Sequence, residues 1–303
     1  MTMDLLDSQA LSTITKTPKQ PKPAKAKPHM AVLSSYLVLL PFFILVVLFL
    51  LAPLGWVVIN AFKDDTGGYT FAYMSRIFSN AFYMQSISNS LKLSLYSSVL
   101  GLLIGLQGAY SLYSIRDSRL GRALVSFNSL LSNFSGVPLA FAMMIVFGSS
   151  GVVTLILSRL GIDDLVDIYS YQGIMLSYVY FQIPLAILLL YPAIESLKKD
   201  WQESAYLLGA SFSQYFLKVG LPVLAPALMG TFIILFANAL GAYATAYALT
   251  SGSLNILPIR ISSLIAGNLT LEPNMAAALA LILVVLMAVI TAVHQYLLHK
   301  YKL

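Results

Sequence analysis

Six stretches of this chain carry no formal charge, and each is long enough to cross a lipid bilayer. They run over residues 28–62, 93–115, 123–158, 168–194, 219–259 and 273–299. A membrane-spanning helix needs about 20 apolar residues, because the hydrocarbon core is about 30 Å thick and each residue advances the helix by about 1.5 Å. The pattern therefore predicts an all-α integral membrane protein with six transmembrane helices.

Composition excludes the main soluble classes. The chain is 58% hydrophobic and only 10% charged, whereas soluble domains are about 25% charged. The absence of cysteine rules out a disulfide framework and a thiolate metal site, and we expect no cofactor or metal. The net charge of +6 is concentrated beside the apolar stretches, which favours membrane orientation over nucleic-acid binding.

The chain divides into a tail and one membrane domain. Residues 1–32 alternate prolines with lysines, which predicts a disordered basic cytoplasmic tail that orients the first span or touches lipid headgroups. The apolar run that follows far exceeds the 7–15 residues of a signal-peptide core. Residues 33–303 are then a six-span transmembrane domain with a polar cytoplasmic loop over 195–222.

The basic residues set the orientation. If the tail is cytoplasmic, the loops that alternation places inside hold 13 of the 18 lysines and arginines, as the positive-inside rule requires. Both termini are then cytoplasmic. Three arginines after the second span, Arg116, Arg119 and Arg122, are explained by anchoring, although they could contact a partner protein or phospholipid. An acidic loop with Asp163, Asp164 and Asp167 is expected on the outside, solvated or facing a soluble receptor.

The polar loop carries strong local signals. Asp200 with Glu203 three residues later predicts a capping box, and Ser211 with Gln214 predicts a second one. Gly209 between them is the expected left-handed helix stop, and Leu221-Pro222 would close the second helix. The loop should therefore form two short helices joined at a glycine corner.

The spacing across this loop resembles a known signature. The residues are Glu203, Ser204, Ala205, Gly209, Val219, Leu221 and Pro222. They match the EAA loop of permease subunits of bacterial binding-protein-dependent ABC importers, with Ser204 for the usual alanine and Val219 for isoleucine. The alternative is a helix corner with no partner.

This resemblance implies a MetI-like type I permease fold in the bacterial inner membrane. It also implies several partners: a separate ATPase that docks on the loop, a second permease subunit, identical or different, and a soluble substrate-binding protein. The stretch from Asn89 to Leu112 is similar to the family's first core helix. The tract Gly241–Ile261 looks most like the branch that handles polyamines, ferric iron and phosphonates.

Neutral polar residues border the spans and are candidates for a translocation path: Asn89, Ser90, Asn238 and Tyr243. Such groups more often bond helices together, and the small residues Gly101, Gly105, Gly108 and Ala109 similarly indicate close helix packing. Abundant tyrosine and phenylalanine, without buried basic residues, favour a polyamine-like cation over an anion, since aromatic faces attract cations.

Two other classes remain open at this point. A self-contained secondary transporter or channel would usually carry ionisable groups within its spans, and only His294 near the end of the last span qualifies. A membrane enzyme needs a catalytic cluster, and only Asp200 and Glu203 come near to one. No phosphate-binding loop is present, so ATP hydrolysis would have to come from a partner, and the chain itself is not expected to be an enzyme.

Overall fold

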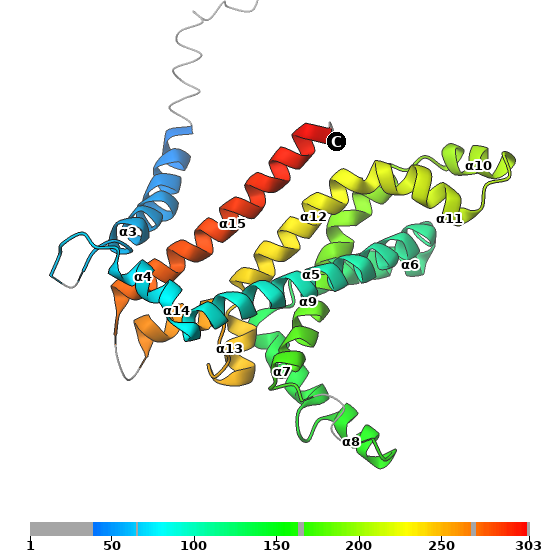
Figure 1. The fold of residues 1–303 in the computed structure, drawn as a ribbon. Coiled ribbons are helices and arrows are strands. Elements are labelled where there is room, and N and C mark those ends of the chain that lie inside the picture. Colours follow the sequence, from blue (N-terminus) through cyan, green and yellow to red (C-terminus); the bar gives the residue numbers. More distant parts are fainter. Residues whose placement is uncertain (1–38, 65, 163–166, 268–270, 302–303) are drawn as a thin grey trace, which may run out of the picture. The chain divides into compact units, whose positions relative to one another are not determined.

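The computed structural model describes residues 39–64, 66–162, 167–267 and 271–301, and the described chain is largely helical (Figure 1). The basic tail expected over residues 1–32 lies outside this part. Contacts divide the chain into two units, residues 1–54 and 55–303. The first unit contains the π-helical turn η1 (Val47–Leu51) and the beginning of α3 (Ala52–Asn60).

The second unit holds the remaining elements. In chain order they are α4 (Ala72–Ser79), α5 (Ala81–Ser114), α6 (Arg119–Leu131), α7 (Gly136–Phe147), α8 (Val152–Arg159), α9 (Tyr171–Glu195), α10 (Lys199–Leu207), α11 (Phe212–Tyr215), η2 (Phe216–Gly220), α12 (Leu221–Gly241), α13 (Ala244–Thr250), α14 (Leu257–Ala266) and α15 (Pro273–Tyr301).

Six helices are long and apolar enough to cross a membrane, which confirms the predicted number. They are Leu39–Asn60, Ala81–Ser114, Gly136–Arg159, Tyr171–Glu195, Phe212–Gly241 and Pro273–Tyr296. The predicted fifth window extended to residue 259, but the structure ends the helix at Gly241 and folds the remainder into the short helices α13 and α14.

Helices α5 and α9 form the most extensive contact in the second unit, and they run in the same direction. Gly101 faces Gln182 and Gly105 faces Ala186; a Cβ built at Gly105 would lie 2.4 Å from the Cβ of Ala186. Small residues let membrane helices approach because lipid offers no hydrophobic drive for their association. The expected close-packing surface on α5 is confirmed.

A buried amide ties a third helix to this pair. Gln182 is fully buried. With its amide nitrogen directed at the carbonyl of Leu235 in α12, at 3.0 Å, its oxygen accepts from the hydroxyls of Ser97 and Ser98 in α5 at 3.0 and 3.1 Å. A polar side chain in the membrane must satisfy its hydrogen bonds within the protein. Gln182 therefore links α5, α9 and α12 at one level of the bundle.

The third crossing is interrupted. Helix α6 packs on the second half of α9, where Asn128 Nδ2 donates to the carbonyl of Pro184 at 3.0 Å. Helix α7 contributes Leu139 and Met143 to a core cluster that includes Ile174 near the start of α9. By length and hydropathy, the third candidate span consists of α7 and α8. By packing, α6 and α7 together lie along the length of α9, with a break between them at residues 132–135. Helix α8 buries none of its residues.

Candidate coupling site and membrane cavity

Helix α10 begins two residues earlier than expected. Its first residue is Lys199, the cap position is Lys198, and no side chain caps this end. The predicted capping box of Asp200 and Glu203 is therefore wrong. Leu197 is buried directly before the cap, so the packing of the turn after α9 places the helix start. Asp200 lies in the first turn, where a carboxylate still favours the helix dipole, and Glu203 is left free of any capping role.

The glycine corner has the predicted conformation. Gly209 has a φ of +81°, its N–H donates to the carbonyl of Tyr206, and the N–H of Ala210 donates to the carbonyl of Ala205. These two bonds are the Schellman pattern that ends a helix at a left-handed residue. No atom lies within 4 Å of a Cβ built on Gly209, so the requirement for glycine is conformational rather than steric.

The next helix start is also as predicted, but its end is not. Ser211 and Gln214 form the complete capping box, with each side chain bonded to the other's backbone N–H. The helix then passes through η2 into α12 instead of closing at Leu221-Pro222. In η2 the N–H of Leu221 donates to the carbonyl of Phe216, five residues earlier. This wider turn accommodates Pro222, which lacks an N–H and would otherwise interrupt a regular helix.

The signature residues consequently divide between two places. Glu203, Ser204, Ala205 and Gly209 lie on α10 and its corner, whereas Val219, Leu221 and Pro222 lie where η2 meets α12. The corner is thus the tip of a helix that continues as the fifth span, which runs from Phe212 to Gly241. Figure 1 shows α10 and α11 beyond the ends of α9 and α12.

Two residues of the corner were not singled out from the sequence. Leu207 and Leu208 are 89% and 88% exposed, the highest exposures among the large apolar residues of the described chain. Their position between Ala205 and Gly209, at the end of a short helix in a polar loop, is the signal that could have identified them. Both leucines lie outside the six apolar spans, on a corner closed by backbone hydrogen bonds.

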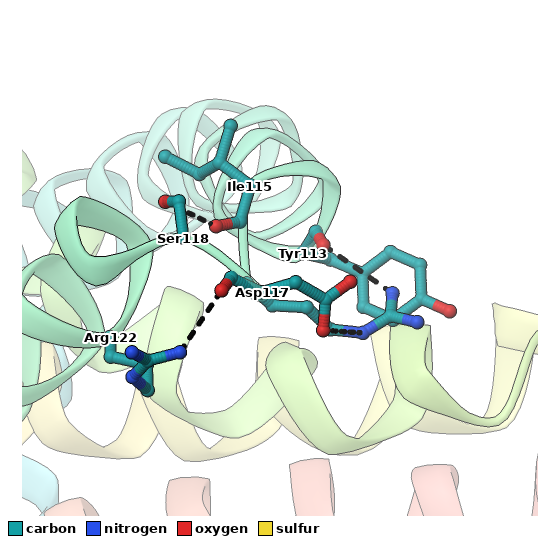
Figure 2. A network of polar contacts seen from close by, with 6 residues as sticks. Tyr113, Ile115, Asp117, Ser118 and Arg122 are labelled. Carbon is teal, nitrogen blue, oxygen red and sulfur yellow. Dashed lines mark hydrogen bonds and ion pairs between the residues drawn. The ribbon is translucent and has the colours of Figure 1, made fainter.

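A cavity of about 390 Å³ lies beneath α10. It is lined by Tyr110, Tyr113, Ser114, Arg116, Asp117, Ile194, Leu197, Lys198, Lys199, Gln202, Glu203, Tyr206 and Tyr215. Its walls come from the end of α5, the turn that follows α5, the end of α9, and the side of α10 that carries Lys199, Gln202 and Tyr206. Figure 2 shows the turn itself: Ser118 donates to the carbonyl of Ile115, and Arg122 donates to the carbonyl of Asp117.

The three arginines of this turn therefore differ. Arg116 lines the cavity, and its guanidinium lies 4.0 Å from the centre of the Tyr113 ring. Arg122 is committed to the backbone of the turn, and Arg119 is exposed on α6. Of the three arginines, Arg116 alone lines the cavity beside α10.

A second cavity, of about 320 Å³, lies where two helices break, and Ser135 and Asn238 in its lining are exposed. It is lined by Ser135, Gly136, Phe181, Ala237, Asn238, Gly241, Ala242, Tyr243, Ala244 and Thr245. Thr245 donates to the carbonyl of Gly136, and the Tyr178 hydroxyl bonds the carbonyl of Ala242. Irregular backbone at membrane depth is tolerated where it is buried in protein or lines a water-filled cavity. Asn238 and Tyr243, two of the four residues predicted for a translocation path, both line this cavity.

Asn89 and Ser90 are placed elsewhere. Asn89 Nδ2 donates to the carbonyl of Asn255 at 3.0 Å, and the Ser90 hydroxyl accepts from the N–H of Leu257 at 2.8 Å. Arg260 holds the same segment by donating to the carbonyls of Gly252 and Leu254, and burial lowers the pKa of its guanidinium. These contacts join α5 to the start of α14.

A family model identifies the chain. Residues 97–303 match the binding-protein-dependent transport system inner membrane component. The chain belongs to this family. It is a multi-pass membrane protein, a permease component of a transport system.

Relatives of this permease handle different solutes. The putative ferric transport system permease protein FbpB 1 of Haemophilus influenzae is 28% identical over 234 residues, which cover 76% of this chain and 36% of that protein. The spermidine/putrescine transport system permease protein PotC of Escherichia coli K12 is 24% identical over 247 residues, 80% of this chain and 87% of that one. The chain thus spans about a third of the length of the ferric relatives.

Solved structures show the same fold. A bacterial ABC transporter involved in alginate import matches with a TM-score of 0.72 at 21% identity, over 88% of this chain and 94% of that chain. The inward-facing MetNI methionine transporter matches with a TM-score of 0.55 at 17% identity, over 72% and 94%. The predicted MetI-like permease fold is confirmed.

Proposed function

We propose that this permease couples a separate ATPase to solute import through the corner formed by α10 and α11. The observation that carries the proposal is the exposed pair Leu207 and Leu208 on a corner closed by hydrogen bonds. Burying a leucine side chain stabilises a complex by about 1.5–3 kcal/mol. The pair supplies affinity for a groove on the ATPase, and the exposed carboxylate of Glu203 supplies orientation.

The same corner is mechanically connected to the spans. Because α11, η2 and α12 form one helix, a displacement of the corner is carried into the fifth span. That span is bonded to α5 and α9 through Gln182. A coupling element needs such a rigid connection, because packed helices shift as units rather than deforming continuously. ATP hydrolysis takes place on the separate ATPase, and the permease supplies the translocation path whose helices move.

We assign part of the path to the cavity lined by Asn238 and Tyr243. The residues that line it carry no formal charge, so a solute is met by amide, hydroxyl and aromatic groups. Phe181 and Tyr243 supply aromatic rings to the lining, and aromatic faces attract cations. We therefore favour a polyamine-like cation, delivered by a soluble binding protein, with the path completed by a second permease subunit. Asn89 and Ser90 serve packing rather than transport.

The test is reconstitution of the permease with its ATPase, second permease and binding protein in vesicles. ATP-dependent uptake of labelled spermidine is expected to exceed uptake of sulfate or ferric iron. The double variant Leu207→Ser/Leu208→Ser should lose ATPase copurification and uptake while inserting normally. Leu271→Ser removes an equally apolar side chain, 64% exposed, before α15 at the other end of the bundle, and should change neither.

Two results would contradict the proposal. Uptake by the permease without any ATPase would indicate a self-contained transporter. Normal ATPase copurification by the double leucine variant would place the coupling surface elsewhere. Preferred uptake of an anion would overturn the assignment of a cation and leave the coupling proposal standing.

Orientation can be tested separately, because the chain has no cysteine. The positive-inside rule places the α5–α6 turn in the cytoplasm and the turn after α3 outside. Cysteine at Thr66 should react with an impermeant maleimide in intact cells with the outer membrane opened, and cysteine at Asp117 should react only after the inner membrane is permeabilised. Both positions are exposed, so reaction at Asp117 from the outside would reverse the proposed orientation.

A further inference from the structure

The cavity beneath α10 contains more positive than negative charge. Three basic residues line it, Arg116 at the end of α5 and Lys198 and Lys199 after α9, against the two carboxylates of Asp117 and Glu203. These basic groups come from segments about 80 residues apart in the sequence, and the fold brings them to one wall. A cluster assembled in this way is a candidate site for an anion.

The carboxylates do little to neutralise this charge. The Asp117 side chain is 89% exposed, and its Oδ1 lies 4.0 Å from Nε of Arg116, at the outer limit of an ion pair. Glu203 is exposed on α10. Within the described part of the chain, neither lysine forms an ion pair with a carboxylate. Arg116 donates one guanidinium N–H to the carbonyl of Tyr113 at 3.4 Å. Its other N–H groups and both lysine ammonium groups are therefore available to a ligand.

Aromatic and apolar groups complete the wall. Tyr110, Tyr113, Tyr206 and Tyr215 line the cavity together with Ile194 and Leu197. Gln202 Nε2 donates to the hydroxyl of Tyr206 at 2.8 Å, and the Lys198 ammonium lies 5.8 Å from the Trp201 ring. Tyrosine and tryptophan are enriched at the level of lipid headgroups, where a polar tip and an apolar ring are both satisfied.

We infer that this cavity binds the phosphate group of an anionic phospholipid of the cytoplasmic leaflet. Basic pockets between the ends of spans on that side are suited to such headgroups, because lysine and arginine give charge-assisted hydrogen bonds to phosphate oxygens. A lipid is favoured over free phosphate because the cavity lies where α5 and α9 end and has apolar residues in its wall. The lipid would bridge the α5 end to α10.

This site would regulate coupling, a consequence that rests on the proposed function. A headgroup held between Arg116 and the two lysines fixes α10 relative to the bundle, so the corner transmits ATPase movement without tilting. Transport by the complex should then rise with the fraction of anionic lipid. Binding of the lipid itself does not depend on the coupling proposal.

The test uses the assembled transporter in nanodiscs of phosphatidylcholine with increasing phosphatidylglycerol. Retained phosphatidylglycerol is counted by native mass spectrometry. Removal of each basic residue is expected to lower the apparent affinity for phosphatidylglycerol about fivefold. Arg116→Gln should therefore lower this affinity about fivefold, and the double variant Lys198→Gln/Lys199→Gln should lower it by about the square of that factor. Arg119→Gln is the matched control, because it makes the same charge change three residues away and outside the cavity. It should leave phosphatidylglycerol retention unchanged.

The outcomes separate this inference from the proposed function. Equal losses for Arg116→Gln and Arg119→Gln would mean that surface charge alone attracts the lipid, and the site would be rejected. Displacement of phosphatidylglycerol by millimolar inorganic phosphate would reject a lipid as the ligand. Unchanged lipid retention in all variants, with ATP-driven uptake intact, would overturn this inference alone, whereas uptake without the ATPase would overturn the proposed function alone.

Discussion

Replacement of Gly209 with valine should abolish coupled uptake while the six spans insert and pack normally. The residue has a φ of +81°, and an L-residue held there costs about 1–2 kcal/mol, more when β-branched. The corner is exposed and free of neighbouring atoms, so it will relieve the strain by changing direction. The exposed leucine pair on α10 would then no longer face the ATPase.

The measurement compares three quantities in reconstituted vesicles: inserted protein, copurified ATPase and ATP-dependent uptake. Gly209→Asn is the control, because asparagine tolerates the left-handed conformation, and it should retain most uptake. Full uptake by Gly209→Val would show that this corner does not transmit the ATPase movement. Failure of both variants to insert would show that the corner is needed for folding instead.

Replacement of Gly105 with valine should prevent correct packing of the bundle. A Cβ at Gly105 would lie 2.4 Å from the Cβ of Ala186 and 3.4 Å from backbone atoms of Ile183 and Ile187. None of these atoms is the free end of a flexible side chain, so α5 and α9 must separate. Overpacking a core typically costs about 1–3 kcal/mol per site, and two further methyl groups increase that cost.

Folded yield in detergent and the midpoint of thermal unfolding measure this effect. Gly230→Val is the matched control, because Gly230 also lies within a span, in α12, and no atom lies within 4 Å of a Cβ built on it. Gly230→Val should have a folded yield and an unfolding midpoint close to those of the unsubstituted protein. The milder variant Gly105→Ala should also lose stability, because its Cβ meets the Cβ of Ala186. Adding Ala186→Gly removes that second Cβ and should restore part of the lost stability. A normal yield for Gly105→Val would contradict the close packing of α5 against α9.

Several features follow from the sequence because their causes are local. Charge-free stretches of about 20 residues determine spans, since a bilayer excludes charge wherever the chain later folds. The left-handed Gly209 and the capping box of Ser211 with Gln214 depend on bonds between residues at most five apart. The resemblance of the loop to the EAA signature likewise depends on residue types and spacing alone.

Other features depend on packing between distant segments. Helix α10 begins at Lys199 because the burial of Leu197 fixes the preceding turn, although the sequence offers a better cap at Asp200. The helix after Ser211 continues past Pro222 because a π turn offsets the backbone bonds. A propensity of about 1 kcal/mol for a cap or a stop is readily outweighed by the burial of apolar side chains nearby.

The sequence by itself determined the membrane class, the number of spans, the glycine corner and the family. Only the tertiary structure decided which polar residues act together. It placed Asn89 and Ser90 in contacts with residues 255–257 and brought Asn238 and Tyr243 to one cavity. It also gathered Arg116 with Lys198 and Lys199. The reason is physical: spacing along a helix sets the face on which a side chain lies, but the neighbouring helix decides what that face meets.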